Sequence, residues 1–600
     1  MLRPVLIAAT ALLLLSGCGT QTGDATPIAS VSGQTAHAVV TSRAGRVYRQ
    51  EIPSEVTGDT TVVQVFEPTQ LVAGQTYPLI LEGHGYGGSR QTTAPDGSFI
   101  KRLNDAGYYV ISIDQRGFGE SSGTVRVMDP DFEGQNLIAV LDWAENLEGL
   151  RRRSNGEMVV GSYGGSYGGM YQFLLAGADP RQRLRVIAPD ITPHDLLYAL
   201  NPNDAIKSGW ALALVAGGEA SGLTGLFSGR IPTGLNQDMT VVETLLKGGL
   251  TNTFPETGRN YFGYHSVRYF CDGVSLGEQN FLLGQADTYQ VPPRAFAQID
   301  ALITQGFRDT LFNFNDGLNN YDCLRARGGD VRLLSHQSGH ILPLTTAPLE
   351  GPLDPFYTAL TLPNFQDGGG NGNCGSIDLQ EARFAWFEEK LQNRGNANAV
   401  ITTQDSVCLS LADDDAISVP AVQRGGTAFF IDSKMPQLNS VLGIVGSLLG
   451  NLLRETLVAT QPLTTVGDSG AVLAGVPLAS IDLLPLTGGL LEQDQCLLPI
   501  LPLGCDPILY LGIGHRKAGT QRWDLIDDQI TPIRGFGHHQ VEMTGIAERL
   551  AAGDELALLV YGFHLQYPIT WSRDLLIPAL KISGRIDLPL LAEGSYRAVP

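Results

Sequence analysis

Met158-Val-Val-Gly-Ser-Tyr-Gly-Gly-Ser-Tyr-Gly-Gly169 joins a short apolar strand to a helix-like run over residues 170–176. Within this stretch, residues 164–168 read G-x-S-x-G, with Ser166 at the centre. Small residues two positions before and after the serine permit a strained strand-to-helix turn, which lifts the hydroxyl clear of the backbone. The pattern predicts that Ser166 is a nucleophile at the end of a strand in a mostly parallel sheet. Ser162 lacks a glycine two positions before it, so we interpret it as a strand-end or turn serine.

Two polar residues farther along the chain are candidates for the partners that a nucleophilic serine needs. An apolar strand over residues 301–303 leads through a glycine to Asp309, and another over residues 331–334 leads to His340. Active sites collect at the carboxyl ends of parallel strands, and serine, acid, histidine is the order expected on such a sheet. We therefore predict Asp309 as the orienting acid and His340 as the base.

Alternatives to both assignments stay open at this point. Asp309 as a loop or helix-cap residue is one of them, and Asp316 is the second candidate acid. His336 is the second candidate base, but its position nearer the strand favours a structural role.

Hydrogen-bond donors must also face the oxyanion of a tetrahedral intermediate. The backbone amide of Tyr167, directly after the nucleophile, is one predicted donor. An apolar strand over residues 78–81 opens into a glycine-rich loop around His84 and Tyr86, and an amide of this loop or the Tyr86 hydroxyl is the second. A glycine turn without a catalytic part is the alternative.

Together these motifs resemble the X-Pro dipeptidyl-peptidase and cocaine-esterase family of serine hydrolases. The G-x-S-Y-x-G pattern lies at residues 164–169, and the family's D-x-R-G-x-x-x-S-x-G signature is present as Asp114-Gln-Arg-Gly-Phe-Gly-Glu-Ser-Ser-Gly123. The resemblance implies the α/β-hydrolase fold and the triad roles already given. It also implies an oxyanion role for the Tyr86 hydroxyl, although Gly85 stands where the esterase branch has proline. We expect Arg116 to brace the loop beside the site.

The chain is predicted to be α/β, a doubly wound mostly parallel sheet with an inserted helical cap and a C-terminal all-β jelly-roll domain. Apolar strands alternate with helical runs such as residues 132–148, the rhythm then stops near residue 201, and short alternating strands fill the last 200 residues. The resemblance implies the cap and the jelly roll at these places. The predicted divisions are 46–200 and 292–395 for the hydrolase domain, 201–291 for the cap and 396–600 for the jelly roll. The cap aromatics proposed for a pocket are Trp210, Tyr261, Phe262, Tyr264, Tyr269 and Phe270.

Within the C-terminal part, leucine and valine recur at helical spacing over residues 438–453 without a charge. Packing against the sandwich is the favoured interpretation, and contact with a membrane surface is the alternative.

The amino terminus has the form of an export signal. A minimal basic start precedes an apolar run over residues 5–15, which is too short to span a bilayer. Leu15-Ser16-Gly17-Cys18 resembles a bacterial lipobox, so we predict a lipoprotein signal over residues 1–18, acylation of Cys18 and a flexible tether over 19–45. The expected location is the bacterial cell envelope, lipid-anchored at the outer membrane or cell surface. A plain secretory signal is the alternative.

Composition narrows the class of protein further. A formal net charge of −21 without a basic patch argues against a nucleic-acid partner. Six cysteines remain after Cys18, an even number that suits disulfides in an oxidising compartment, and only Cys496 with Cys505 is suggested by closeness. No His or Cys spacing indicates a metal site, and we expect no cofactor.

The sequence therefore predicts an exported hydrolase that cleaves an ester or amide bond of a small molecule or peptide through an acyl-enzyme. A broad carboxylesterase is slightly favoured over an X-Pro dipeptidyl-peptidase, because no residue marks an amine-binding site. The carboxylates that could supply a charge for an amine are Glu82, Glu120, Glu219 and Asp272, and the sequence positions none of them. An acyltransferase and a non-catalytic surface binding protein are the remaining alternatives.

Overall fold

The computed structural model describes residues 40–227, 235–279, 286–342, 372–403, 405–435, 456–486, 506–572 and 580–599. Several predictions fall outside these ranges and stay predictions. They are the signal and tether over residues 1–39, the pair Cys496 and Cys505, and the apolar helix over 438–453.

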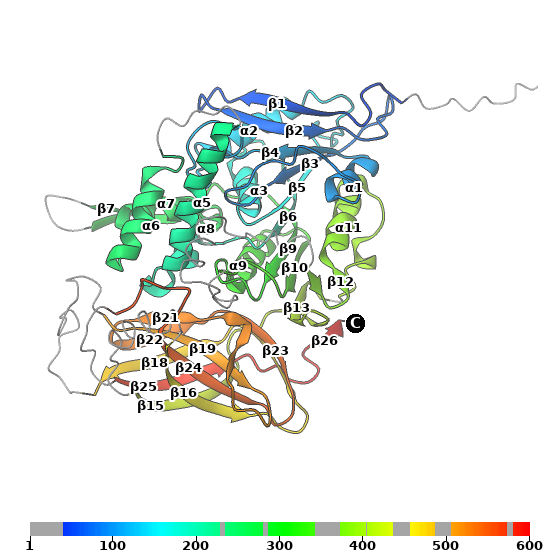
Figure 1. Ribbon diagram of the computed structural model, residues 1–600. Helices are drawn as coiled ribbons and strands as arrows, with labels where there is room; N and C mark the ends of the chain where they lie inside the picture. Colours follow the sequence, from blue (N-terminus) through cyan, green and yellow to red (C-terminus); the bar gives the residue numbers. More distant parts are fainter. Residues whose placement is uncertain are drawn as a thin grey trace, which may run out of the picture. The chain divides into compact units, whose positions relative to one another are not determined.

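One large sheet carries the candidate catalytic motifs (Figure 1). Its strand order is β1-β2-β4-β3-β5-β6-β9-β10-β13-β14-β26. The run from β4 through β13 is parallel, and the strands at both edges are antiparallel. The strands are β1 Val47–Pro53, β2 Thr60–Phe66, β3 Leu79–Gly83, β4 Tyr109–Ile113, β5 Val160–Gly165, β6 Val186–Asp190, β9 Asp300–Gly306, β10 Val331–His336, β13 Val407–Ala412, β14 Asp415–Val419 and β26 Arg597–Val599.

Helices cover both faces of this sheet, so its central strands are buried on both sides. One face packs against α1 (Phe99–Asp105) and α11 (Leu379–Gln392). The other packs against α2 (Glu133–Ala144), α3 (Tyr167–Ala178) and α9 (Phe314–Arg325). The helical run predicted over residues 132–148 corresponds to α2.

The insertion after β6 is mainly helical, as predicted, but it ends in an antiparallel hairpin that the sequence interpretation missed. The hairpin follows α8 directly, and no sequence motif marks its two short strands. The sequence interpretation therefore included these residues in the predicted helical cap. The elements are α4 Leu196–Leu200, η1 Pro202–Asp204, α5 Ser208–Phe227, α6 Met239–Thr251, α7 Glu256–Tyr264, α8 Val267–Asp272, β7 Val274–Gln279 and β8 Ala286–Val291.

The C-terminal part forms separate antiparallel sheets that share one apolar core. One contains β15 (Thr427–Met435), β25 (Leu580–Leu588), β18 (Leu478–Pro485) and β22 (Gly537–Glu542). Another contains β16 (Thr456–Thr465), β24 (Glu555–Phe563), β19 (Ile508–Arg516), β20 (Asp524–Leu525) and β21 (Thr531–Arg534). The smaller elements are β11 Asn373–Cys374, β12 Ile377–Asp378, η3 Ala397–Ala399, β17 Ala471–Gly475, η4 Ile526–Asp528 and β23 Ile546–Leu550.

The predicted fold class is confirmed by the large mostly parallel sheet and the antiparallel sheets that follow it. Strands β13, β14 and β26 lie after residue 395, yet they pair with the hydrolase sheet. The chain therefore enters the sandwich only after β14 and returns to the first sheet with β26.

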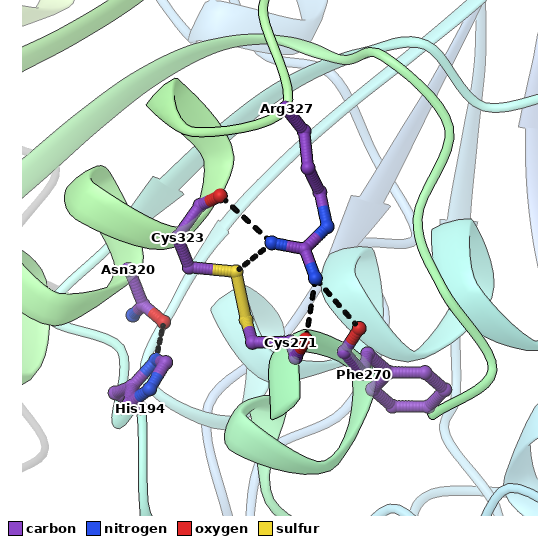
Figure 2. The surroundings of a disulfide bond; sticks show 6 residues. All are labelled: His194, Phe270, Cys271, Asn320, Cys323 and Arg327. Atoms are coloured by element: carbon purple, nitrogen blue, oxygen red, sulfur yellow. Dashed lines mark hydrogen bonds between the residues drawn. A yellow bond between two sulfur atoms is a disulfide. The ribbon is translucent and has the colours of Figure 1, made fainter. Parts of the chain in front are cut away.

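Two disulfides join described residues, Cys271–Cys323 and Cys374–Cys408. The first links α8 of the insertion to α9 of the hydrolase sheet (Figure 2). Arg327 strengthens this link by donating to the Cys323 carbonyl at 3.0 Å and to the carbonyls of Cys271 and Phe270. Beside it, Nδ1 of His194 lies 3.0 Å from the Asn320 side-chain oxygen. The insertion is thus covalently fixed at α8, just before its hairpin.

Among the described helices, none combines the length and apolar character needed to cross a bilayer.

Candidate active site

Ser166 occupies a strained turn between β5 and α3. Its φ of 59° and ψ of −122° lie in a region that a non-glycine residue rarely adopts. The turn fits because Gly83 approaches it closely: a Cβ at Gly168 would lie 2.1 Å from the Gly83 carbonyl oxygen, and one at Gly164 would lie 2.4 Å from the same atom. The Ser166 amide donates to the Asp190 carbonyl at 2.9 Å, which ties the turn to β6. The geometry is that of a nucleophile elbow, with the serine at the N-terminus of a helix.

Asp309 and His340 form a buried hydrogen-bonded pair. Nδ1 of His340 lies 2.6 Å from Oδ2 of Asp309, and both side chains are fully buried. The other carboxylate oxygen accepts the backbone N–H groups of Leu311 at 2.9 Å and Phe312 at 2.7 Å. Because a carboxylate can only accept here, Nδ1 carries the ring proton and Nε2 carries the lone pair that a general base needs.

Glycine also permits this pairing. Gly339 has a φ of +142°, and a Cβ there would lie 2.5 Å from the Asp309 Cβ. The ring of His340 is held edge-on by Phe312 at 5.1 Å and Trp210 at 6.0 Å between centroids. The imidazole is therefore fixed by packing as well as by its carboxylate.

The alternative acid and base have other partners in the structure. Asp316 accepts the backbone N–H groups of His194 and Asp195, and burial raises its pKa to about 7. His336 lies 3.1 Å from Asp190 through Nε2 and accepts from the Ser338 hydroxyl at Nδ1. Asp316 and His336 thus brace neighbouring loops.

One cavity connects the nucleophile to the insertion. It has a volume of about 30 Å³ and is almost entirely apolar. Its lining includes Ser166, Tyr86 and Tyr167 from the sheet side, with Leu311 and Phe312 from the loop after Asp309. The insertion contributes Leu196, Leu200, Leu214, Val241, Leu245 and Phe262. Of the six cap aromatics considered from the sequence, Phe262 lines this cavity and Trp210 contacts His340 instead.

The Tyr86 hydroxyl donates to Oε1 of Gln237 at 2.6 Å. The Gln237 amide is oriented because its nitrogen donates to the Val215 carbonyl at 2.8 Å and to Glu219. Burial raises the pKa of Tyr86, so its hydroxyl stays protonated. Tyr86 lies beside Ser166, as predicted, but its proton is directed at the insertion in this conformation, and its oxyanion role stays a prediction.

His84, in the same loop, is a neutral structural residue. Its Nδ1 donates to the Gly85 carbonyl at 2.8 Å, and its Nε2 accepts the Gln115 amide at 3.0 Å. Burial lowers its pKa, which favours this uncharged form.

The D-x-R-G signature braces the loop next to the site. Asp114 accepts the Arg90 amide at 2.6 Å and the Glu120 amide at 2.8 Å. Arg116 donates to the Thr124 carbonyl and pairs with Asp59, which is the bracing role expected for it.

Sequence reasoning missed Lys207 as well as Gln237. The buried Lys207 ammonium donates to the carbonyls of Thr310 at 3.0 Å and Leu311 at 2.8 Å, directly after Asp309. Burial lowers its pKa to about 8. Neither residue lies in a motif, so only the fold reveals that both position the catalytic loops.

In the described part of the chain, no cluster of three or more His, Cys, Asp or Glu side chains is arranged to hold a metal ion.

The sequence that forms this site is similar to that of known hydrolases. The model of the X-Pro dipeptidyl-peptidase (S15) family matches residues 57–221, which contain Tyr86, the D-x-R-G signature and the nucleophile elbow. Two Escherichia coli sequences, each described as an uncharacterized 31.7 kDa protein in the traX-finO intergenic region, are 30% and 29% identical over 138 residues. That alignment spans 23% of this chain and 46% of each relative, so the chain spans about half the length of the curated relatives it matches.

Among solved structures, a CocE/NonD family hydrolase from Staphylococcus aureus is similar over 91% of this chain and 94% of that protein, with a TM-score of 0.54. At 10% sequence identity this likeness establishes the fold. The resemblance predicted from the motifs is confirmed. Residues 57–221 match the model of the X-Pro dipeptidyl-peptidase (S15) family, and the chain has the fold of a CocE/NonD family hydrolase.

Proposed function

We propose that the protein is a carboxylesterase that cleaves esters with a small apolar acyl group. The observation that carries the proposal is the apolar lining of the cavity beside Ser166. An acyl chain would bury its methylene groups against this lining, whereas a charged amine would lose its hydration there without a partner.

The proposed reaction uses the buried pair and the elbow. Nε2 of His340 takes the Ser166 proton as the serine oxygen bonds to the substrate carbonyl carbon, and Asp309 stabilises the imidazolium. The Tyr167 amide and a donor of the Tyr86 loop bind the oxyanion. The C–O bond to the alcohol then breaks, the alcohol leaves with the His340 proton, and a water molecule activated by His340 releases the acid from Ser166.

A second candidate is an X-Pro dipeptidyl-peptidase, the activity in the name of the matching family model. Such an enzyme must bind a free amine near the nucleophile. Glu219 is the best placed carboxylate, because it supports Gln237 behind Tyr86, but it already accepts two backbone N–H groups there. Glu120 pairs with two arginines and Glu82 accepts from Ser112, so the esterase is favoured.

Export and anchoring through an acylated Cys18 belong to the same proposal. The lipobox-like Leu15-Ser16-Gly17-Cys18 motivates it, and two disulfides suit an oxidising compartment. Metabolic labelling with an alkyne fatty acid, compared between wild type and Cys18→Ser, tests this part. Equal labelling of the two proteins contradicts it.

The decisive assay compares p-nitrophenyl butyrate with Gly-Pro-p-nitroanilide on purified protein, with Ser166→Ala as the blank. Serine-dependent turnover of the ester alone supports the esterase. Efficient release from Gly-Pro would replace it with the dipeptidyl-peptidase. Absence of serine-dependent turnover on both, together with no fluorophosphonate labelling of Ser166, would instead favour a non-catalytic binding protein. A serine that labels and transfers its acyl group to an added alcohol would indicate an acyltransferase.

A further inference from the structure

A larger cavity lies beneath the two helices on the other face of the sheet. It has a volume of about 330 Å³ and opens between α1 and α11. Gly164 and Gly165 form part of its wall, so it adjoins the backbone that leads into Ser166. None of its side chains belongs to the catalytic machinery described above, and its volume lies in the range of small-molecule sites.

Arg383 of α11 brings a buried positive charge to this cavity. It is 6% exposed, and its guanidinium lies 6.0 Å from the ring centroid of Phe99 and 5.8 Å from that of Tyr163. Among the described residues, Arg383 has no direct ion pair or hydrogen bond, and its charge acts on the buried Asp190 carboxylate, whose pKa it helps to lower. The two rings stabilise the cation by contact with their faces but satisfy none of its five N–H donors.

The other buried arginines of the described chain show how unusual this is. Arg90 pairs with Asp114 and Glu120, and Arg183 pairs with Asp179 and Asp142. Arg116 likewise has Asp59. Because Arg383 lacks such a direct ion pair and lines a cavity, its guanidinium is suited to an anionic ligand that can accept its N–H groups.

The remaining lining defines the class of anion. The planar guanidinium matches a carboxylate, with which it can form two parallel hydrogen bonds. Gln91, Thr93 and Ser98 offer neutral polar groups, while Pro95 and Phe99 offer apolar surface. The buried Glu82 carboxylate also lines the cavity and would repel a second negative charge. We propose that this cavity binds a small organic carboxylate, a monoanion with an apolar body, whose carboxylate pairs with Arg383.

Binding of sodium benzoate to the full chain tests the site without measuring turnover. Benzamide is the uncharged analogue, phosphate the multiply charged anion, and sodium chloride controls ionic strength. We expect benzoate alone to bind saturably by titration calorimetry and to raise the Tm by about 1–3 °C at saturation. No saturable benzoate binding, or equal binding of benzoate and benzamide, overturns the proposal.

Variants locate the binding. Arg383→Gln should abolish benzoate binding, and Arg383→Lys should weaken it by about tenfold because the paired donors are lost. Arg102→Gln is the matched control, since Arg102 lies on α1 and pairs with Glu381 of α11 at the surface. It should bind benzoate as the wild type does. Benzoate that still binds Arg383→Gln with unchanged affinity occupies another site, such as the cavity beside Ser166, and overturns the proposal. If Arg383→Gln does not fold, two measurements still test the proposal. They are the binding of benzoate against benzamide to the wild type, and the binding of benzoate to Arg383→Lys.

Discussion

At the scale of single residues, Asp309 and Asp316 are two buried carboxylates separated by one short loop. Asp309 accepts from His340, and Asp316 accepts from the backbone at residues 194 and 195. The first therefore fixes the imidazole tautomer, and the second fixes the loop after β6. This difference in partners makes the two assignments separable by experiment.

We predict that Asp309→Asn lowers kcat by about 10³–10⁴-fold with little change in KM, because an asparagine amide reverses the favoured tautomer of His340. Asp316→Asn should lower the Tm but leave kcat within about tenfold of wild type. Steady-state kinetics and thermal unfolding of both variants on the ester substrate check this. A loss of kcat in Asp316→Asn alone would mean that Asp316 is the catalytic acid and Asp309 the structural carboxylate.

Ser166, Asp309 and His340 were predictable because each follows an apolar strand in the order that a parallel sheet imposes. Gln237 and Lys207 were not, since they act through contacts with Tyr86 and with the loop after Asp309 that only the folded insertion creates. Gln237 also sets the direction of the Tyr86 hydroxyl, which could therefore not be predicted from the sequence.

At the scale of elements, the Cys271–Cys323 bridge joins α8 to α9, and the two cysteines are 52 positions apart in the sequence. Both helices flank the site, since α9 follows the loop of Asp309 and the insertion lines the cavity. Loss of the crosslink should therefore loosen the insertion as well as the fold.

Replacing both cysteines by serine should destabilise the protein by up to about 4 kcal/mol, because the unfolded chain regains the entropy of that loop. Limited proteolysis should then cleave the insertion faster. Cys374→Ser with Cys408→Ser is the control, since this pair joins β11 to β13 away from the insertion. Equal rates of cleavage in the two double variants would contradict a role for the first bridge in holding the insertion.

His515 couples the stability of the C-terminal sheets to pH. It lies 3.3 Å from Glu548 and 2.9 Å from Asp554, and these carboxylates raise its pKa. A raised pKa in the folded state means that the stabilisation is complete below the unfolded value of about 6.5 and is lost as pH rises through the folded value.

His515→Gln should therefore lower the free energy of unfolding by about 1–2 kcal/mol at pH 6 and by less at pH 9. Denaturant titrations at the two pH values measure this difference. His538→Gln is the control, because His538 is half exposed beside Asp482 and should change little at either pH. A His515→Gln penalty that does not shrink with pH would show that packing, not charge, is its contribution.

The elements themselves were largely predictable, but their pairing was less so. The helical run that forms α2 stood out in the sequence, and the strands after residue 427 alternate as expected. Strands β13 and β14 were assigned to the sandwich because they lie near the start of a β-rich region. The sequence of a short strand does not show which sheet the strand joins. Only their neighbours, β10 and β26, decide that.

At the scale of the whole molecule, the cavity beside Ser166 is too small for a substrate. About 30 Å³ corresponds to roughly one water molecule. Because six of its lining residues come from the insertion, entry of an acyl group requires the insertion to move. Turnover should therefore depend on that motion as well as on the triad.

A shortened chain tests how far the two parts of the molecule depend on each other. Residues 40–395 lack β13, so strand β10 would present an unpaired edge with Leu333 and Leu334. We predict that this fragment aggregates and shows no serine-dependent activity, whereas the full chain is monodisperse. Size-exclusion chromatography of both proteins decides, and a soluble active fragment would show that the sheet is complete without its outer strands.

The return of β26 to the first sheet also sets an order of assembly during synthesis. Its partner β14 is made about 180 residues earlier, and the intervening chain must fold into the sandwich before the two can meet. The outer edge of this sheet is therefore completed only after the sandwich strands that lie between β14 and β26 in the sequence have been made. A nascent chain cannot close that edge before β26 has been made, so the edge of β14 stays accessible to chaperones until then.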